Sequence, residues 1–304
     1  MQLVECVPNI SEGRRADVVG KVVAAVRTAA DVSLLDVHSD PDHNRSVLTL
    51  VGGAVAVAEA AFALAAVCAA EINMRQHRGV HPRMGALDVL PFVPLGSTPM
   101  ALCVELAHDV GRRLAAELRL PVYFYAEAAL RPERRLLANV RRGEYEGLLA
   151  RVGIDPDAEP DAGPPALGTA GATAVGARKV LVAFNVRLGT RDVRAAREIA
   201  RRVRASSGGL PGVQALGLEL ATQNMVQVSM NVTDLARTPV HIAYEAVCAA
   251  AADLGVAVAE SELVGLLPAD AALPAASRQL GLPELTPLQI IDLAIHQDAP
   301  NRDG

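Results

Sequence analysis

The stretch GIDPDAEPDAGPPALGTAGATAVGA, residues 153–177, decides how the chain divides. It is rich in Pro, Gly and Asp and shows no sustained hydrophobic periodicity, which is typical of a linker. Strand-like and helix-like patterns stop before it and resume after it. A loop of this length is usually either functional or flexible. We therefore expect two subdomains, residues 1–177 with this linker at their end and residues 178–304.

Before the linker, the spacing of apolar residues alternates between the periods of strands and helices. QLVECVP (2–8) is expected to be a strand, and Ser11 is expected to cap the helix that follows. Further strands are predicted at 32–38, 46–53, 85–95 and 121–127, and further helices after residue 53 and at about 100–118. The first six elements have the order βαββαβ.

After the linker the same order returns. The predicted elements are a strand at 179–188, a helix at 192–205, the strands VQALGLEL and MVQVSMNV, the helix HIAYEAVCAAAADLG and the strand VAVAESEL. The repeated order predicts an α+β protein of two consecutive ferredoxin-like (βαββαβ) subdomains, each with its helices on one face of a sheet. The free sheet faces are expected to enclose a ligand groove.

Charge and cysteine content exclude several classes of protein. The net charge is −5 and the sequence pI is about 5.8, so no overall basic field attracts nucleic acid. The four cysteines, Cys6, Cys68, Cys103 and Cys248, form no CxxC pair. This spacing fits neither a zinc site nor a disulfide framework, and it favours free thiols in a cytoplasmic protein.

Two apolar segments have some features of a targeting signal or a membrane span. The N-terminus carries Glu5 within its apolar run and has no basic region, so it does not resemble a signal peptide. Residues 52–72 are apolar enough to resemble a membrane span, but they are rich in Ala and include Glu59. We expect a buried helix there and no membrane association.

Polar residues interrupt apolar segments at several places, and His81 in HPRMG stands out among them. Pro82 biases His81 to an extended conformation, and Gly85 permits a tight turn into the next strand. An imidazole on such a stiff loop can act as a general acid or base near neutral pH. Taken alone, a histidine here is more often structural. No HxH, HxxxH or HExxH spacing supports a metal site.

Other polar residues are candidates for binding an anionic substrate, Arg83 because its planar guanidinium matches a carboxylate. Each of them alone also fits a turn or a solvated surface. The substrate-binding candidates are Asn9, Asn44, Arg45, Arg83, Arg178, Asn185 and Asn231.

Seven blocks of the sequence together resemble the glutamate formimidoyltransferase family. They are VECVPNISEGR, DHNRSVLTLVG, HPRMGALDVLPFVP, TAGATAVGARK, VAFNV, QVSMN and ELVGLLP, and they run in the family's order from residue 2 to about residue 268. The resemblance implies two ferredoxin-like subdomains with folate bound between them. It also implies transfer of the formimino group from N-formimino-L-glutamate to tetrahydrofolate, a step of histidine catabolism and one-carbon metabolism.

The resemblance assigns roles to particular residues. The family's catalytic histidine falls on His81. Its folate-binding segment falls on Pro164, Pro165, Ala166, Leu167, Gly168, Thr169, Ala170, Gly171 and Ala172. Tetrahydrofolate is then the co-substrate, no metal is needed, and a homodimer is expected. Fused relatives carry a cyclodeaminase domain after this region, so here that activity is expected from a separate protein.

Two departures from the family pattern keep other functions open. Val80 stands where the family commonly has an acidic residue, and the 164–172 segment contains no aromatic side chain. One alternative is therefore action on another folate, such as 5-formyltetrahydrofolate. The other is a non-catalytic protein that binds folate or a partner.

Overall fold

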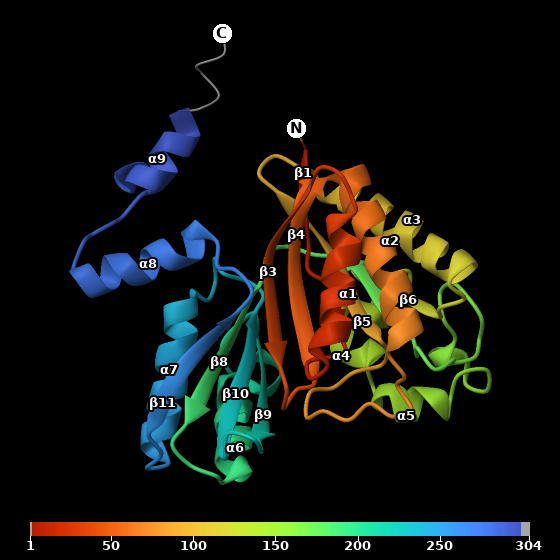
Figure 1. Cartoon of the computed structure of the whole chain (residues 1–304). Helices are drawn as coiled ribbons and strands as arrows, with labels where there is room; N and C mark the ends of the chain where they lie inside the picture. The colour runs from red at the N-terminus through yellow and green to blue at the C-terminus, as the bar shows by residue number, and fades with distance from the viewer. Residues whose placement is uncertain (1, 299–304) are drawn as a thin grey trace. The chain divides into compact units, whose positions relative to one another are not determined.

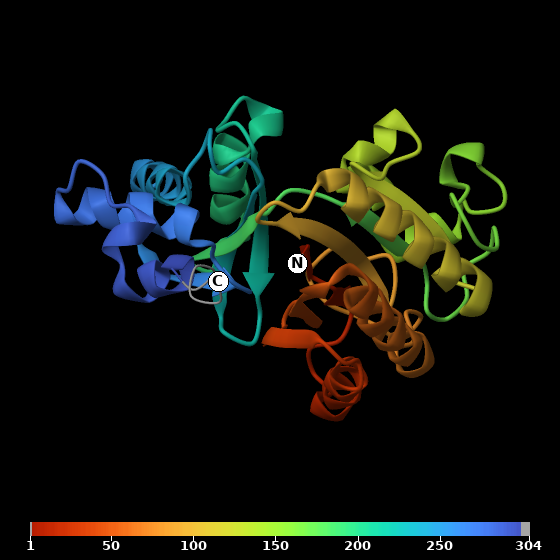
Figure 2. The ribbon, with the colours of Figure 1, turned by 90° about the horizontal axis from the view of Figure 1, so that it is seen from above.

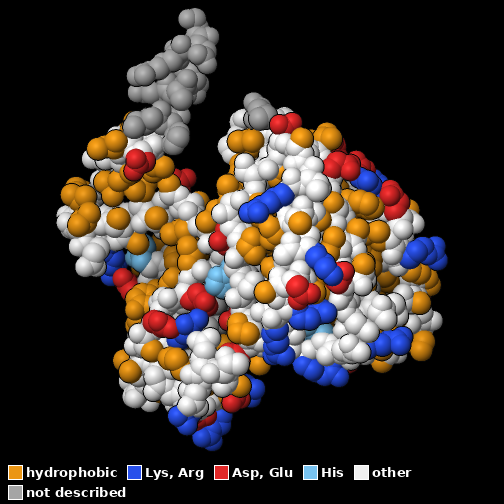
Figure 3. All heavy atoms as spheres, viewed as in Figure 1, with side chains coloured by type: hydrophobic (Ala, Val, Ile, Leu, Met, Phe, Trp, Pro, Cys, Tyr) orange, Lys and Arg blue, Asp and Glu red, His pale blue; other side chains and the backbone are white. Residues whose placement is uncertain are grey.

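The computed structural model describes residues 2–298, which divide into two compact units, unit 1 (Met1–Val180) and unit 2 (Leu181–Gly304). Each unit combines one β-sheet with helices, so the chain is an α+β protein (Figure 1). On the surface shown in Figure 3, Lys and Arg side chains lie among Asp and Glu side chains rather than in one broad basic field.

Unit 1 contains a seven-stranded sheet and most of the helices. Its elements are β1 (Leu3–Cys6), β2 (Asn9–Ile10), α1 (Ala16–Arg27), β3 (Val32–Asp40), β4 (Arg45–Gly53), α2 (Ala54–Glu71), β5 (Leu87–Leu95), α3 (Met100–Glu117), β6 (Val122–Ala126), η1 (Pro132–Arg135), α4 (Leu137–Val140), α5 (Glu144–Leu149), η2 (Pro156–Ala158) and β7 (Thr173–Ala177).

The strand order of unit 1 places β5 near the middle of its sheet. β3 pairs with β4, both β1 and β2 lie between β4 and β5, and all of these pairings are antiparallel. β7 and β6 extend the sheet beyond β5 in parallel pairing. α2 contacts both α1 and α3, all three helices contact the sheet, and Figure 2 shows them along one face. The core of unit 1 consists mostly of aliphatic side chains, together with the aromatic residues Phe92, Tyr123, Phe124, Tyr125 and Tyr145.

The helix α2 is the segment that resembled a membrane span. It is long and apolar enough to cross a membrane by length and composition alone. In unit 1 it packs against α1, α3 and the strands β1 and β4. Its buried side chains are Val57, Ala60, Ala61, Leu64, Ala65 and Cys68. The expectation of a helix with one face in the core is confirmed.

Two local expectations for unit 1 were wrong. Ser11 does not cap α1, which begins at Ala16; its hydroxyl instead donates to the Gly85 carbonyl at 2.7 Å. The linker expected at 153–177 contains regular structure, because its last residues form the fully buried strand β7. The pairing of β7 with two strands distant in sequence explains why local periodicity did not reveal it.

Unit 2 has a four-stranded sheet in the order β11-β8-β10-β9, with every pair antiparallel. Its elements are β8 (Val182–Leu188), α6 (Val193–Val203), η3 (Ala205–Ser207), β9 (Val213–Leu220), β10 (Met225–Val232), α7 (Val240–Asp253), β11 (Val258–Val264), α8 (Ala269–Leu280), η4 (Pro287–Gln289) and α9 (Ile291–Asp298). α6 begins where the pattern predicted, because the Asp192 carboxylate accepts the Arg194 N–H at 2.9 Å and caps the helix. α6 and α7 pack together on this sheet.

Candidate active site

The loop between α2 and β5 carries His81, and the segment that ends at Ala172 runs beside it. Backbone hydrogen bonds join the two: Met74 N to Thr169 O at 2.7 Å, Ala86 N to Ala170 O at 2.7 Å, and Ala172 N to Met84 O at 3.0 Å. The last part of the predicted folate-binding segment therefore lies against the predicted catalytic loop, within one unit.

Two glycines make this close approach possible. A Cβ atom on Gly85 would lie 2.0 Å from the Ala172 carbonyl oxygen. Gly171 has a φ of +71°, and a Cβ atom there would lie 2.4 Å from the Met84 carbonyl oxygen. Neither position has room for a side chain, because the obstructing atoms belong to the backbone. Gly85 was expected to permit a turn, and glycine is required there because the Ala172 backbone lies so close.

His81 is half-buried, and its Nδ1 lies 2.8 Å from the carbonyl oxygen of Pro82. A carbonyl oxygen can only accept, so Nδ1 carries the proton in the neutral ring and Nε2 carries the lone pair. Burial lowers the pKa of His81 well below its ordinary value, and the charges of Arg45, Arg141 and His43 lower it further. The His43 ring is close by, with its centroid 5.5 Å from that of His81. At neutral pH, His81 is an uncharged proton acceptor.

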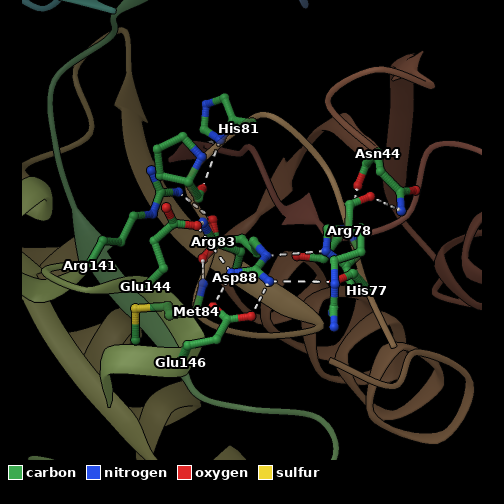
Figure 4. A network of polar contacts seen from close by, with 12 residues as sticks. Asn44, His77, Arg78, His81, Arg83, Met84, Asp88, Arg141, Glu144 and Glu146 are labelled. Atoms are coloured by element: carbon green, nitrogen blue, oxygen red, sulfur yellow. Dashed lines mark hydrogen bonds and ion pairs between the residues drawn. The ribbon is translucent and has the colours of Figure 1, made fainter. Parts of the chain in front are cut away.

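The cations beside His81 are organised by Asp88, a fully buried residue of β5. Asp88 Oδ2 accepts from Arg45 Nη1 at 2.7 Å and also from Arg141 Nη2, while Oδ1 accepts the Met84 N–H at 2.8 Å. Arg45 additionally donates to Asn9 Oδ1 at 2.9 Å. Burial alone would raise the pKa of Asp88, but Arg141 and Arg45 lower it below its ordinary value, so the carboxylate is charged. Figure 4 shows Asp88 at the centre of this network.

Arg83 forms ion pairs with carboxylates of the protein itself. Its guanidinium contacts Glu146 through two hydrogen bonds of 2.7 Å and Glu144 through one of 3.1 Å. Its Nε donates to His77 Nδ1 at 3.3 Å (Figure 4). The hydrogen bonds from Arg83 lower the pKa of Glu146 to about 2. These contacts tie the loop to α5, whereas the sequence analysis expected Arg83 to hold a substrate anion.

The remaining candidates have different surroundings. Asn44 has a φ of +48°, and its side chain bonds Gly13 N and Arg78 O, both at 3.0 Å, which braces the turn between β3 and β4. Arg178 follows β7, and its Nη1 donates to the Lys179 carbonyl at 3.0 Å. Asn185 and Asn231 belong to unit 2, on β8 and β10; Asn185 donates to Glu262 at 2.9 Å.

Folate-segment residues differ in exposure. Pro165, Ala166, Gly168 and Thr169 are exposed, Pro164 and Ala170 are half-buried, and Leu167, Gly171 and Ala172 are buried. In the described part of the chain, no group of three His, Cys, Asp or Glu side chains is arranged to hold a metal ion.

Asp88 and Arg141 are not among the substrate-binding candidates that were selected from the sequence. The available signal was a carboxylate inside the otherwise apolar run LDVLPFVPL, because a charge in a buried strand requires a partner. Nothing in the local sequence indicates that this partner is a pair of arginines, one from β4 and one that follows α4.

The lowered pKa of His81 predicts a dependence of stability on pH. The pKa of histidine in an unfolded chain is about 6.5, so below this pH the unfolded state binds a proton that the folded state does not. The stability that the neutral His81 side chain contributes is therefore fully present above about pH 6.5. It falls by up to about 1.4 kcal/mol per pH unit as the pH drops towards the folded-state pKa. When the pH is lowered from 7.5 to 5.5, the free energy of unfolding of His81→Gln should therefore rise by about 1 kcal/mol relative to that of the wild type. Urea denaturation at both pH values measures this, and a pH-independent difference would contradict it.

Comparison with known proteins gives matches along nearly the whole chain. The family "Formiminotransferase domain, N-terminal subdomain" matches residues 3–178, and "Formiminotransferase domain" matches residues 183–296. A glutamate formimidoyltransferase of Thermoplasma acidophilum is 47% identical over 283 residues, which cover 93% of each chain. One of Streptococcus pyogenes is 42% identical, covering 92% of this chain and 93% of the relative. A formimidoyltransferase-cyclodeaminase of Gallus gallus is 44% identical, covering 90% of this chain and 52% of the relative.

Proposed function

The chain belongs to the formiminotransferase family, and on that basis we propose that it transfers the formimino group of N-formimino-L-glutamate to tetrahydrofolate. The products are 5-formiminotetrahydrofolate and L-glutamate. The observation that carries the proposal is the neutral imidazole of His81, whose Nδ1 is fixed on the Pro82 carbonyl and whose Nε2 can accept a proton.

The reaction needs a group that moves one proton between two nitrogens. N5 of tetrahydrofolate attacks the formimino carbon, which gives a tetrahedral intermediate. Nε2 of His81 takes the proton from N5 and gives it to the glutamate nitrogen as the bond from that nitrogen to carbon breaks. The low pKa of His81 makes its protonated form a good donor for this second transfer. Proton transfer of this kind typically contributes a factor of about 10² to 10⁴.

We assign the surrounding residues supporting roles. Asn9 and Arg45 belong to the substrate site, through their shared contact beside Asp88. Arg83 positions the loop through Glu144 and Glu146 rather than touching substrate. Residues 164–172 bind folate; their backbone contacts with the His81 loop support this role. Asn44, Arg178, Asn185 and Asn231 are kept as substrate-binding candidates to be tested by substitution.

We propose that each unit is built on the ferredoxin-like βαββαβ plan, with the boundary at residues 177 and 178. In unit 2, the order β11-β8-β10-β9 corresponds to fourth, first, third and second strand, which supports this plan. In unit 1, β3, β4, the β1–β2 pair and β5 follow the same order, with β7 and β6 added. The compact units end and begin at residues 180 and 181. The groove expected between the subdomains stays a prediction.

The cellular setting is also part of the proposal. The four cysteines are free thiols, which is the state in which a reducing cytoplasm keeps cysteine side chains. Relatives such as the one from Gallus gallus carry the name formimidoyltransferase-cyclodeaminase, and we propose that a separate cyclodeaminase consumes the product here. A homodimer is proposed as the solution state.

A coupled assay tests the function. The purified protein is mixed with N-formimino-L-glutamate, tetrahydrofolate and an independent cyclodeaminase, and ammonia release from the formimino product is measured. Ammonia should appear only when all components are present. A second arm offers 5-formyltetrahydrofolate and glutamate, and a third measures tetrahydrofolate binding by calorimetry. Turnover in the second arm alone would favour the alternative folate substrate, whereas binding without turnover in either would favour a non-catalytic protein.

A further inference from the structure

Arg45 and Arg141 carry more positive charge than their protein partner neutralises. Both guanidinium groups donate to the same oxygen of Asp88. Two positive charges and one negative charge leave a net charge of +1 on these three side chains. The exposed fraction of the side chain is 7% for Arg45, 14% for Arg141 and 0% for Asp88. Burial lowers the pKa of Arg45 to about 10, and it still remains charged at neutral pH. An excess charge in such a place is favourable when an anion completes it.

Arg141 has an unused donor. Within residues 2–298, its Nε is buried and makes no hydrogen bond. The corresponding Nε of Arg45 is occupied, because it donates to Asn9 Oδ1 at 3.2 Å. A buried guanidinium N–H without a partner is costly, and a carboxylate is the acceptor whose geometry matches it best. Arg141 is therefore the member of the pair that has a donor available for an added anion.

The position of the pair selects one carboxylate of the substrate. In the proposed reaction, His81 protonates the glutamate nitrogen, and the α-carboxylate is separated from this nitrogen by a single carbon atom. The γ-carboxylate lies two methylene groups farther along the side chain. Asp88, which both guanidinium groups share, accepts the N–H of Met84, three residues after His81. Arg45 and Arg141 therefore lie beside the His81 loop, near the nitrogen that His81 protonates.

We propose that Arg141, with Arg45 held beside it on Asp88, binds the α-carboxylate of the amino-acid substrate. The inference rests on the proposed function and extends it to a residue that determines substrate specificity. The subsite would favour N-formimino derivatives of α-amino acids over those of simple amines. Figure 4 shows Arg141 and His81 in one close-up of the polar contacts around Asp88.

The test removes one carboxylate at a time from the substrate and one guanidinium from the protein. N-formimino-4-aminobutyrate lacks the α-carboxylate, and N-formimino-L-2-aminobutyrate lacks the γ-carboxylate. In the wild type, loss of the α-carboxylate should lower kcat/KM by about 10- to 100-fold, mostly through KM, as expected for charge-assisted hydrogen bonds. In Arg141→Met the same loss should cost less than about threefold, because the partner is already gone.

Arg142→Met is the matched control. Arg142 is exposed and bonds only its neighbour Asn139, at 3.2 Å, among the contacts described for its side chain. This variant should keep the full penalty for the missing α-carboxylate. The inference is overturned when Arg141→Met also keeps that penalty, or when it becomes insensitive to the γ-carboxylate instead. If Arg141→Met fails to fold, Arg141→Lys, which keeps the charge, should show a KM raised about 3- to 10-fold for the two substrates that carry the α-carboxylate and an unchanged KM for N-formimino-4-aminobutyrate.

A binding experiment separates this inference from the proposed function. Calorimetry with L-glutamate, 4-aminobutyrate and L-2-aminobutyrate needs no turnover. If the wild type transfers no formimino group, the proposed function fails, yet the subsite stands if Arg141→Met weakens binding of L-glutamate and L-2-aminobutyrate at least tenfold. Equal binding of the three compounds by the wild type would overturn the subsite even if transfer is observed.

Discussion

Replacement of His81 with alanine should lower kcat for formimino transfer by about 10²- to 10⁴-fold. The imidazole accepts the proton from N5 and returns it to the departing nitrogen, and an alanine side chain has no group that can do either. Its Nδ1 contact is with the adjacent Pro82 carbonyl, so its loss removes little from the fold. Tetrahydrofolate affinity and melting temperature should therefore stay nearly unchanged. Steady-state kinetics, calorimetry and thermal melting measure these three quantities.

His108→Ala serves as the matched control for this prediction. His108 also bonds a backbone carbonyl, that of Ala128 at 2.8 Å, and packs edge-on against Phe124 with ring centroids 4.7 Å apart. These contacts hold the fold together and involve no substrate. Loss of the His108 side chain should therefore lower the melting temperature and leave kcat of the folded fraction unchanged. A folded His81→Ala protein with wild-type turnover would end the catalytic assignment. It would mean that His81 only holds its own loop.

Replacement of Asp88 with asparagine should lower the free energy of unfolding by about 3 to 5 kcal/mol. The substitution keeps the shape and an oxygen for the Met84 N–H but removes the negative charge that Arg45 and Arg141 share. Two guanidinium groups then remain buried side by side without a counter-charge. Chemical denaturation followed by circular dichroism gives the magnitude, with the transition of unit 1 followed separately if the units unfold in two steps.

Asp109→Asn makes the same chemical change at the surface. Asp109 pairs with Arg112 at 2.7 Å on α3, and both side chains are more than half exposed, at 73% and 63%. Exposed pairs of this kind contribute about 0 to 1 kcal/mol, so this variant should be nearly as stable as the wild type. Similar losses in the two variants would show that burial gives Asp88 no special role.

The parts of the fold that could be predicted are those written in local periodicity. The strand expected at 46–53 is observed as Arg45–Gly53, and the helix expected at 192–205 as Val193–Val203. The errors arose where distant segments decide. Ser11 bonds Gly85 rather than a helix terminus, and β7 exists because β5 and β6 flank it. A five-residue run of small side chains carries no periodicity that distinguishes it from a loop.

The candidate site was predictable to a similar degree. Pro82 and Gly85, which follow His81, indicated a stiff loop, and the candidates Arg45 and Asn9 bond each other beside Asp88. The partner of a particular arginine was not predictable, because it depends on tertiary neighbours. Arg83 is bound by α5, while Arg141, which is not among the substrate-binding candidates of the sequence analysis, bonds Asp88.

The single carboxylate shared by Arg45 and Arg141 has a consequence for how this protein can evolve. Loss of Asp88 leaves two buried guanidinium groups without a counter-charge, whereas loss of one arginine leaves Asp88 paired with the other. Drift can therefore remove one arginine from the three residues, but the remaining ion pair can be replaced only in near-simultaneous steps, because either loss leaves a buried charge unpaired. Because they come from β4, β5 and the turn after α4, recombination within this unit would also separate them and expose the same incompatibility.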